Sequence, residues 1–127
     1  MTENKIKALI ADDSQFMRQL IAEYLLSMGI SKTFHAANGE QALKLLKENT
    51  DINLLICDWS MPKVDGLALA QEAKKILDDN CAYFLVTSEN SPDVLKKFKD
   101  LGVTNYLIKP FAENDFQNAM KALINND

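Results

Sequence analysis

Polar side chains suited to phosphate or metal chemistry stand at the ends of short apolar runs in this sequence. These residues are Asp12, Asp13, Asp58, Thr87 and Lys109. Taken singly, each has an ordinary structural explanation, because a carboxylate can favour a helix start or a turn and a lysine can extend into solvent. Their repeated placement after apolar runs is what indicates a shared site.

The carboxylates of such a site would repel one another unless a cation lay between them. Lys109 supplies one positive charge, which is too little for three aspartates. A divalent ion with oxygen ligands is the natural complement, and Mg²⁺ suits a site with few carboxylates and several bound waters. The single histidine and the two cysteines form no zinc-binding pattern. The sequence therefore predicts a magnesium site.

Carboxylates, Mg²⁺, an ammonium and a hydroxyl together suit phosphoryl transfer. A carboxylate can attack phosphorus and form an acyl phosphate, while the cations and the hydroxyl stabilise the transferred group. We therefore predict that Asp58 is the nucleophile. Asp12 and Asp13 are predicted to hold the metal, and Lys109 and Thr87 to contact the phosphoryl group. A nucleotide site is disfavoured, because no GxGxxG or GxxxxGK[ST] loop is present.

The elements that must position these side chains alternate between short strands and longer helices. Five apolar runs are predicted to be strands, at residues 6–11, 33–36, 53–57, 82–87 and 106–109. The stretches after them carry apolar residues at helical spacing, with Ser14 and Ser91 as helix starts and Asn38-Gly39 as a turn. This order predicts an α/β fold, a doubly wound five-stranded parallel sheet with helices on both faces. A ligand site would lie at the carboxyl ends of its strands.

Length and charge exclude several classes of protein. The chain has 127 residues, which fits a single domain over residues 1–127. Its net charge of -4 disfavours binding to nucleic acid or to an anionic membrane surface. The first apolar run is too short for a signal peptide or an anchor, and Cys57 and Cys81 lack metal or redox spacing. A cytoplasmic protein is expected.

Four motifs closely resemble the receiver domain of two-component response regulators. They are the acidic pair in IADDS, the acceptor block ICDWSMPKVDG, the hydroxyl in LVTSE, and NYLIKPF. The resemblance spans essentially the whole chain and implies the flavodoxin-like strand order 2-1-3-4-5. It also implies a phosphoacceptor protein whose only catalysis is its own phosphorylation and dephosphorylation. No effector domain is expected, because the chain ends directly after the last predicted helix.

The resemblance implies that a histidine kinase donates a phosphoryl group to Asp58 in the presence of Mg²⁺. Asp58 and the backbone carbonyl of Ser60 would join the acidic pair as metal ligands, and the Lys109-Pro110 peptide would be cis. After phosphorylation, Thr87 is expected to move toward the phosphoryl oxygens and Tyr106 to turn inward. These shifts would change the face formed by the fourth helix, the fifth strand and the fifth helix, which a downstream protein binds.

The stand-alone chemotaxis branch of the family is the most similar in its tryptophan after the acceptor, its Tyr106 and its length. Ser60 stands where the family more often has asparagine, and Glu89 lies two residues after Thr87. Both are expected to flank the path of attacking water and so to tune autodephosphorylation. A phosphatase is a further candidate partner, and the protein is expected to be a monomer or a phosphorylation-dependent dimer.

Other functions remain open for these residues. A phosphorelay intermediate, or a receiver used only for docking, would carry the same motifs. An aspartate-dependent phosphatase would need an acid–base carboxylate two residues after the nucleophile, where this chain has Ser60. A flavodoxin-like electron carrier would need a hydroxyl- and glycine-rich loop where Asp12 and Asp13 would repel a flavin phosphate.

Overall fold

Five strands alternate with five helices in the part of the chain that the structure describes. The computed structural model describes residues 5–77, 81–89 and 91–125. In chain order the elements are β1 (Lys7–Ala11), α1 (Gln15–Ser27), β2 (Lys32–Ala36), α2 (Gly39–Glu48), β3 (Leu54–Cys57), α3 (Gly66–Ile76), β4 (Ala82–Thr87), α4 (Pro92–Asp100), β5 (Tyr106–Ile108) and α5 (Glu113–Ile124). The strands form one parallel sheet in the order β2-β1-β3-β4-β5. The predicted fold class and strand order are confirmed.

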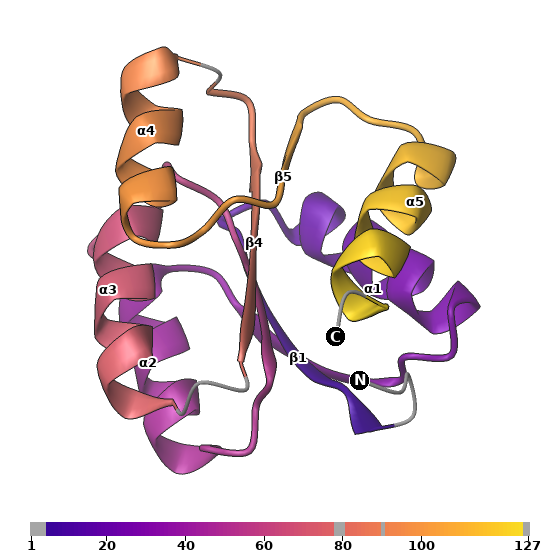
Figure 1. Cartoon of the computed structure of the whole chain (residues 1–127). Helices are drawn as coiled ribbons and strands as arrows, with labels where there is room; N and C mark the ends of the chain where they lie inside the picture. The colour runs from indigo at the N-terminus through magenta and orange to yellow at the C-terminus, as the bar shows by residue number, and fades with distance from the viewer. Residues whose placement is uncertain (1–4, 78–80, 90, 126–127) are drawn as a thin grey trace.

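The helices form a layer on each face of the sheet (Figure 1). Helices α1 and α5 cover one face, and α2, α3 and α4 cover the other. Two apolar cores result, one built around Phe84 and Phe116 and the other around Leu55 and Phe98. All four residues of the central strand β3 are buried. This explains why the strand sequence LLIC is continuously apolar instead of alternating.

The start of α2 differs from the sequence prediction. Asn38-Gly39 is not a separate turn, because Asn38 is extended and its side chain accepts a hydrogen bond from the Gln41 N–H at 2.8 Å. Asn38 is therefore the N-cap, and Gly39 is the first helical residue. A Cβ added at Gly39 would lie 2.1 Å from the carbonyl oxygen of Val64. The glycine is needed for this close contact between α2 and the loop that precedes α3.

The register of the sheet aligns the strand ends that carry the polar residues. Ala11 pairs with Cys57, so the residues that follow, Asp12 and Asp58, leave the sheet side by side. Thr87 pairs with Ile108, which places Lys109 just beyond Thr87. The strand β5 thus ends one residue earlier than the sequence predicted. Within the described residues, no helix is long and apolar enough to cross a membrane.

Candidate functional site

The side chains of Asp12, Asp58 and Lys109 meet at the carboxyl edge of the sheet. The Lys109 ammonium donates hydrogen bonds to Asp12 Oδ2 at 2.7 Å and to Asp58 Oδ2 at 2.9 Å. Asp12 is 2% exposed and Asp58 7% exposed, so these contacts are largely shielded from solvent. Charge-assisted hydrogen bonds of this kind are stronger than neutral ones. Residues that are 51 and 97 positions apart in sequence therefore form one cluster.

Asp12 is held by hydrogen bonds on both its backbone and its side chain. Its N–H donates to the Ala36 carbonyl at 3.1 Å, which extends the pairing of β1 with β2. Its Oδ1 accepts from the Ser14 N–H at 2.9 Å. Burial raises the pKa of the Asp12 carboxyl, and the hydrogen bonds from Lys109 and Ser14 oppose that rise. The carboxylate is thus fixed in place and costly to leave without a cation.

The pKa of Lys109 is shifted by the same contacts that act on Asp12. Burial alone would lower the pKa of its ammonium, but the hydrogen bonds to Asp12 and Asp58 outweigh burial and raise the pKa above the usual 10.5. Lys109 is therefore charged at neutral pH. The backbone also holds the residue, since the Lys109 N–H donates to the Thr87 carbonyl at 2.8 Å. The Lys109-Pro110 peptide is cis, as the resemblance to receiver domains implied.

The loop after Asp58 has its two ends close together, so that the start of α3 contacts the end of β3. The Asp58 N–H donates to the Ala11 carbonyl at 3.0 Å, and the Gly66 N–H donates to the Trp59 carbonyl at 2.9 Å. A Cβ at Gly66 would lie 2.0 Å from the Asp58 carbonyl oxygen, so only glycine fits there. The Ser60 N–H faces Asp58 Oδ1 at 3.3 Å, while the Ser60 side chain is exposed. The loop therefore holds the Asp58 backbone from its Gly66 end and the Asp58 carboxylate from its Ser60 end.

Asp13 completes a group of three carboxylates. One oxygen from each of Asp12, Asp13 and Asp58 lies within 4.8 Å of the others, and Asp13 is exposed. With all three ionised, the single ammonium of Lys109 leaves two negative charges uncompensated. The donor set is oxygen only and has an open side at Asp13. These residues fit a hard divalent cation, and an acidic triad of this kind is typical of a Mg²⁺ site.

Thr87 and Glu89 lie on the β4 side of this cluster. Thr87 is 1% exposed, and its hydroxyl accepts a hydrogen bond from the Glu89 N–H at 3.1 Å. The Glu89 side chain is exposed and accepts from the Ser91 N–H at 2.9 Å, just before α4. Thr87 thus lies at the predicted edge of the sheet, whereas the Glu89 carboxylate is bonded to the start of α4.

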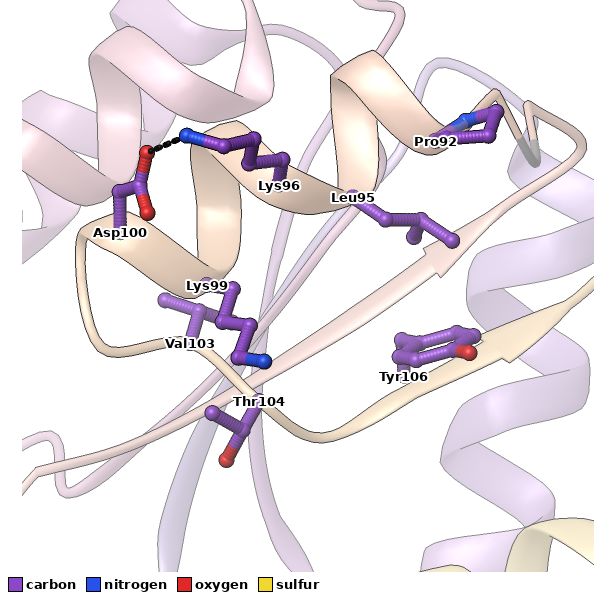
Figure 2. A pocket seen from close by; sticks show the side chains of 8 residues that line it. All are labelled: Pro92, Leu95, Lys96, Lys99, Asp100, Val103, Thr104 and Tyr106. Atoms are coloured by element: carbon purple, nitrogen blue, oxygen red, sulfur yellow. Dashed lines mark hydrogen bonds and ion pairs between the residues drawn. The ribbon is translucent and has the colours of Figure 1, made fainter.

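Tyr106 lies away from the carboxylates, on a groove between α4 and β5 (Figure 2). This α4–β5 groove has a volume of about 700 Å³, and Pro92, Leu95, Lys99 and Tyr106 are among its lining residues. Tyr106 is 47% exposed, which is unusual for a large aromatic side chain on a strand. The inward turn of Tyr106 after phosphorylation stays a prediction.

Arg18 contacts the site and was not predicted from the sequence, whereas Trp59 was predicted to neighbour the site but not to contact α4. Arg18 donates from Nη1 to the Asp12 carbonyl oxygen at 2.6 Å, and the Trp59 ring packs edge-on against Phe98 of α4 at 5.8 Å. Arg18 lies six residues after Asp12, and no spacing rule signals a side chain that folds back from a helix to a strand end. The position of Trp59, directly after the proposed nucleophile, was the only available signal for its contact with α4.

Comparison with known sequences identifies relatives along most of the chain. The family model described as response regulator receiver domain matches residues 8–121. The chemotaxis protein CheY homolog of Campylobacter jejuni subsp. jejuni is 36% identical over 108 residues, which make up 84% of this chain and 82% of that protein. The sporulation initiation phosphotransferase F of Bacillus subtilis is 34% identical over 116 residues, covering 91% of this chain and 90% of that protein.

Comparison with solved structures gives the same fold. The structure titled as a CheX-CheY-BeF3-Mg+2 complex from Borrelia burgdorferi contains a chain that matches with a TM-score of 0.86 at 22% identity. The match covers 94% of this chain and 89% of that chain.

Proposed function

The chain belongs to the response regulator receiver domain family, and from this premise we propose that Asp58 accepts a phosphoryl group from a histidine kinase. The observation that carries the proposal is the Lys109 ammonium, which is bonded at once to Asp58 and to Asp12. A lysine held in this way is a preorganised cation beside the nucleophile. Such a group is most effective where charge develops during transfer.

In the proposed reaction, a carboxylate oxygen of Asp58 attacks the phosphorus of the donor phosphohistidine. A P–O bond forms at Asp58 while the P–N bond of the donor breaks, and the imidazole leaves with the bonding electron pair. Lys109 stabilises the charge on the transferred oxygens, and the Thr87 hydroxyl donates a hydrogen bond to one of them. Hydrolysis of the acyl phosphate later returns the carboxylate, and we propose that Ser60 and Glu89 tune the access of water.

Mg²⁺ would be held by the carboxylates of Asp12, Asp13 and Asp58 and by the backbone carbonyl of Ser60. Bound there, it would neutralise the charge of the phosphoryl group that Lys109 alone cannot balance. Two observations support this assignment: the three carboxylates converge, and a related receiver crystallised as a CheX-CheY-BeF3-Mg+2 complex.

We propose that the output surface is the face formed by α4, β5 and α5. It includes the α4–β5 groove, where Tyr106 and Lys99 are exposed and Lys96 forms an ion pair with Asp100. Lys97 lies on the same helix, over the Trp59 ring. Phosphorylation would draw Thr87 toward the site and leave room for Tyr106 to turn inward, which would reshape the groove that a downstream protein binds. The switch would then work through a change in the population of two surface conformations.

The pathway is proposed to be chemotaxis, because relatives named as chemotaxis proteins match at 31–36% identity. A phosphorelay intermediate is the second candidate, because the sporulation phosphotransferase matches at 34%. In either case we propose a cytoplasmic protein made of one receiver domain, monomeric or dimerising on phosphorylation. Its partners would be a kinase, a target protein and a phosphatase.

The proposal is tested by mass spectrometry of the intact protein after exposure to acetyl phosphate. A gain of one phosphoryl group is expected with Mg²⁺ and not with EDTA. Asp58→Asn should abolish the gain, whereas Asp93→Asn, which removes an exposed carboxylate from α4, should retain it. Persistence of the gain in Asp58→Asn would rule out Asp58 as the acceptor. Trp59, the only tryptophan, provides a second readout, since its fluorescence should change on adding Mg²⁺ and again on adding the phosphodonor.

A further inference from the structure

Arg18 is the one arginine of the chain, and it lies in α1 close to the acidic cluster. The backbone N–H of Arg18 donates to the Ser14 carbonyl at 3.0 Å, so the residue belongs to the regular helix. Its side chain folds back toward the strand end, and Nη1 donates to the backbone carbonyl of Asp12 at 2.6 Å. The short distance is typical of a charge-assisted hydrogen bond.

The carbonyl that Arg18 binds belongs to the peptide between Asp12 and Asp13. A peptide unit is planar and rigid, so fixing its oxygen also fixes the direction in which the chain continues to Asp13. We propose that Arg18 is a positioning residue that sets the relative placement of the Asp12 and Asp13 carboxylates for binding a divalent cation. The inference rests on the proposed metal-dependent phosphorylation and adds a residue outside the family motifs described above.

The placement of the Asp13 carboxylate depends on the backbone more than that of the Asp12 carboxylate does. The Asp12 side chain has its own hydrogen bonds, from Ser14 and from Lys109. Among the described residues, none donates a hydrogen bond to the Asp13 carboxylate, which is exposed. The point from which the Asp13 side chain starts, its Cα, is therefore placed by the peptide unit that precedes it, and Arg18 is the side chain that holds this unit.

The arrangement has a cost that a merely solvated arginine would avoid. Arg18 Nε is buried and has no hydrogen-bond partner in the part of the chain that the structure describes. An unsatisfied buried N–H is unfavourable, and more so on a charged group. The side chain is held in this position in spite of that cost, which agrees with a role for the contact at Asp12.

His35 offers an independent marker of where the guanidinium lies. Arg18 and His35 line one groove between α1 and β2, together with Glu23. Burial lowers the pKa of His35, and the positive charge of Arg18 lowers it further. His35 is the only histidine, so its titration can be followed by NMR without ambiguity.

The test compares Arg18→Gln with Arg18→Lys and with Lys47→Gln, a matched loss of charge on the exposed end of α2. The readout is Mg²⁺ affinity, followed through Trp59 fluorescence. An electrostatic effect and a positioning effect of Arg18 predict opposite changes in Mg²⁺ affinity. Removing a positive charge near a dication should tighten Mg²⁺ binding by electrostatics alone. Loss of positioning should weaken it, and we expect Arg18→Gln to bind Mg²⁺ roughly tenfold more weakly, in the range for residues that orient metal ligands.

Arg18→Lys should bind with intermediate affinity, because it keeps the charge but loses the planar fork that reaches the carbonyl. Lys47→Gln should bind like the wild type. In Arg18→Gln the pKa of His35 should rise; an unchanged pKa would show that the guanidinium does not lie beside β2 and would overturn the inference. Equal or tighter Mg²⁺ binding by a folded Arg18→Gln would also overturn it, while leaving the proposed function intact. Failure of the wild type to bind Mg²⁺ would overturn both.

Discussion

Replacing Gly66 by alanine should distort the loop that carries the proposed phosphoacceptor. Gly66 is the first residue of α3, and its N–H donates to the Trp59 carbonyl at 2.9 Å. An added Cβ would lie 2.0 Å from the carbonyl oxygen and 2.8 Å from the carbonyl carbon of Asp58. These atoms belong to the backbone of the central strand end, so no flexible side chain can move aside to make room.

The expected loss of stability follows from these contacts. Overpacking against a rigid neighbour costs about 1–3 kcal/mol, and displacing the Gly66 N–H from Trp59 loses about 1 kcal/mol more. Alanine has the higher helix propensity, but this gain is less than about 1 kcal/mol at the first position of a helix. The net change in the free energy of unfolding is therefore a decrease of about 1–4 kcal/mol.

Urea unfolding of Gly66→Ala measures this change, and Gly102→Ala provides the matched control. Gly102 has a φ of +96°, but a Cβ there would lie 3.5 Å from Lys74 Nζ, an ordinary contact. The free energy of unfolding of Gly102→Ala should fall by only about 1–2 kcal/mol, because alanine is strained in the left-handed backbone conformation of Gly102. This control should be phosphorylated at the wild-type rate. Gly66→Ala should also be phosphorylated more slowly, because Asp58 shifts. A Gly66→Ala protein with wild-type stability would refute the close approach of α3 to Asp58.

Four other predictions follow from the contacts of the site and its supports. Lys109→Met should slow phosphorylation by acetyl phosphate roughly 100-fold or more, as for loss of one charge-stabilising group. The folded pKa of Lys109 is raised above 10.5. With its carboxylate partners ionised, the stabilisation from its charge is therefore complete below pH 10.5 and is lost as the pH rises through the folded pKa. The difference in unfolding free energy between wild type and Lys109→Met should shrink over that alkaline range. Burial, with a smaller effect of the Asp58 charge, raises the pKa of Cys57 to about 12. At pH 8 about one Cys57 thiol in 10⁴ is therefore ionised. A disulfide reagent should modify Cys57 only after the protein unfolds. Asn38→Ala should destabilise the protein by about 1 kcal/mol in urea unfolding, because α2 loses its N-cap hydrogen bond; an unchanged midpoint would contradict the cap.

Much of this architecture could be predicted because its signals are local. Continuous apolar runs mark strands buried on both faces, and polar residues directly after them must lie at one edge of a parallel sheet. This reasoning placed Asp12, Asp58 and Lys109 together before any distance was known. The strand order came from the resemblance, since periodicity alone does not say which strands are neighbours.

What the sequence could not supply depends on contacts between distant segments. Asn38-Gly39 has the composition of a turn, and only the approach of Val64 shows why the glycine is required within a helix. Lys109 was predicted to contact the phosphoryl group. Its hydrogen bonds to Asp12 and Asp58 form because the ends of three strands meet at the same edge of the sheet. Arg18 reaches the Asp12 carbonyl because α1 begins at Gln15, soon after β1 ends at Ala11. Such side-chain directions are set by packing and have no sequence period.

Under the proposed function, the hydrogen bonds of Lys109 to Asp12 and Asp58 suggest a route from Asp58 to the α4–β5 groove. An acyl phosphate at Asp58 no longer offers the carboxylate that Lys109 binds, so the ammonium must redistribute its contacts. The Lys109 N–H donates to the Thr87 carbonyl, and Tyr106 lies three residues earlier, at the start of the strand that ends just before Lys109. Under the proposed function, a change of charge at β3 therefore acts first on the β4–β5 pair. In this proposal the signal would reach the groove through β5, which begins at Tyr106 and ends directly before Lys109, without requiring Asp58 to touch the groove.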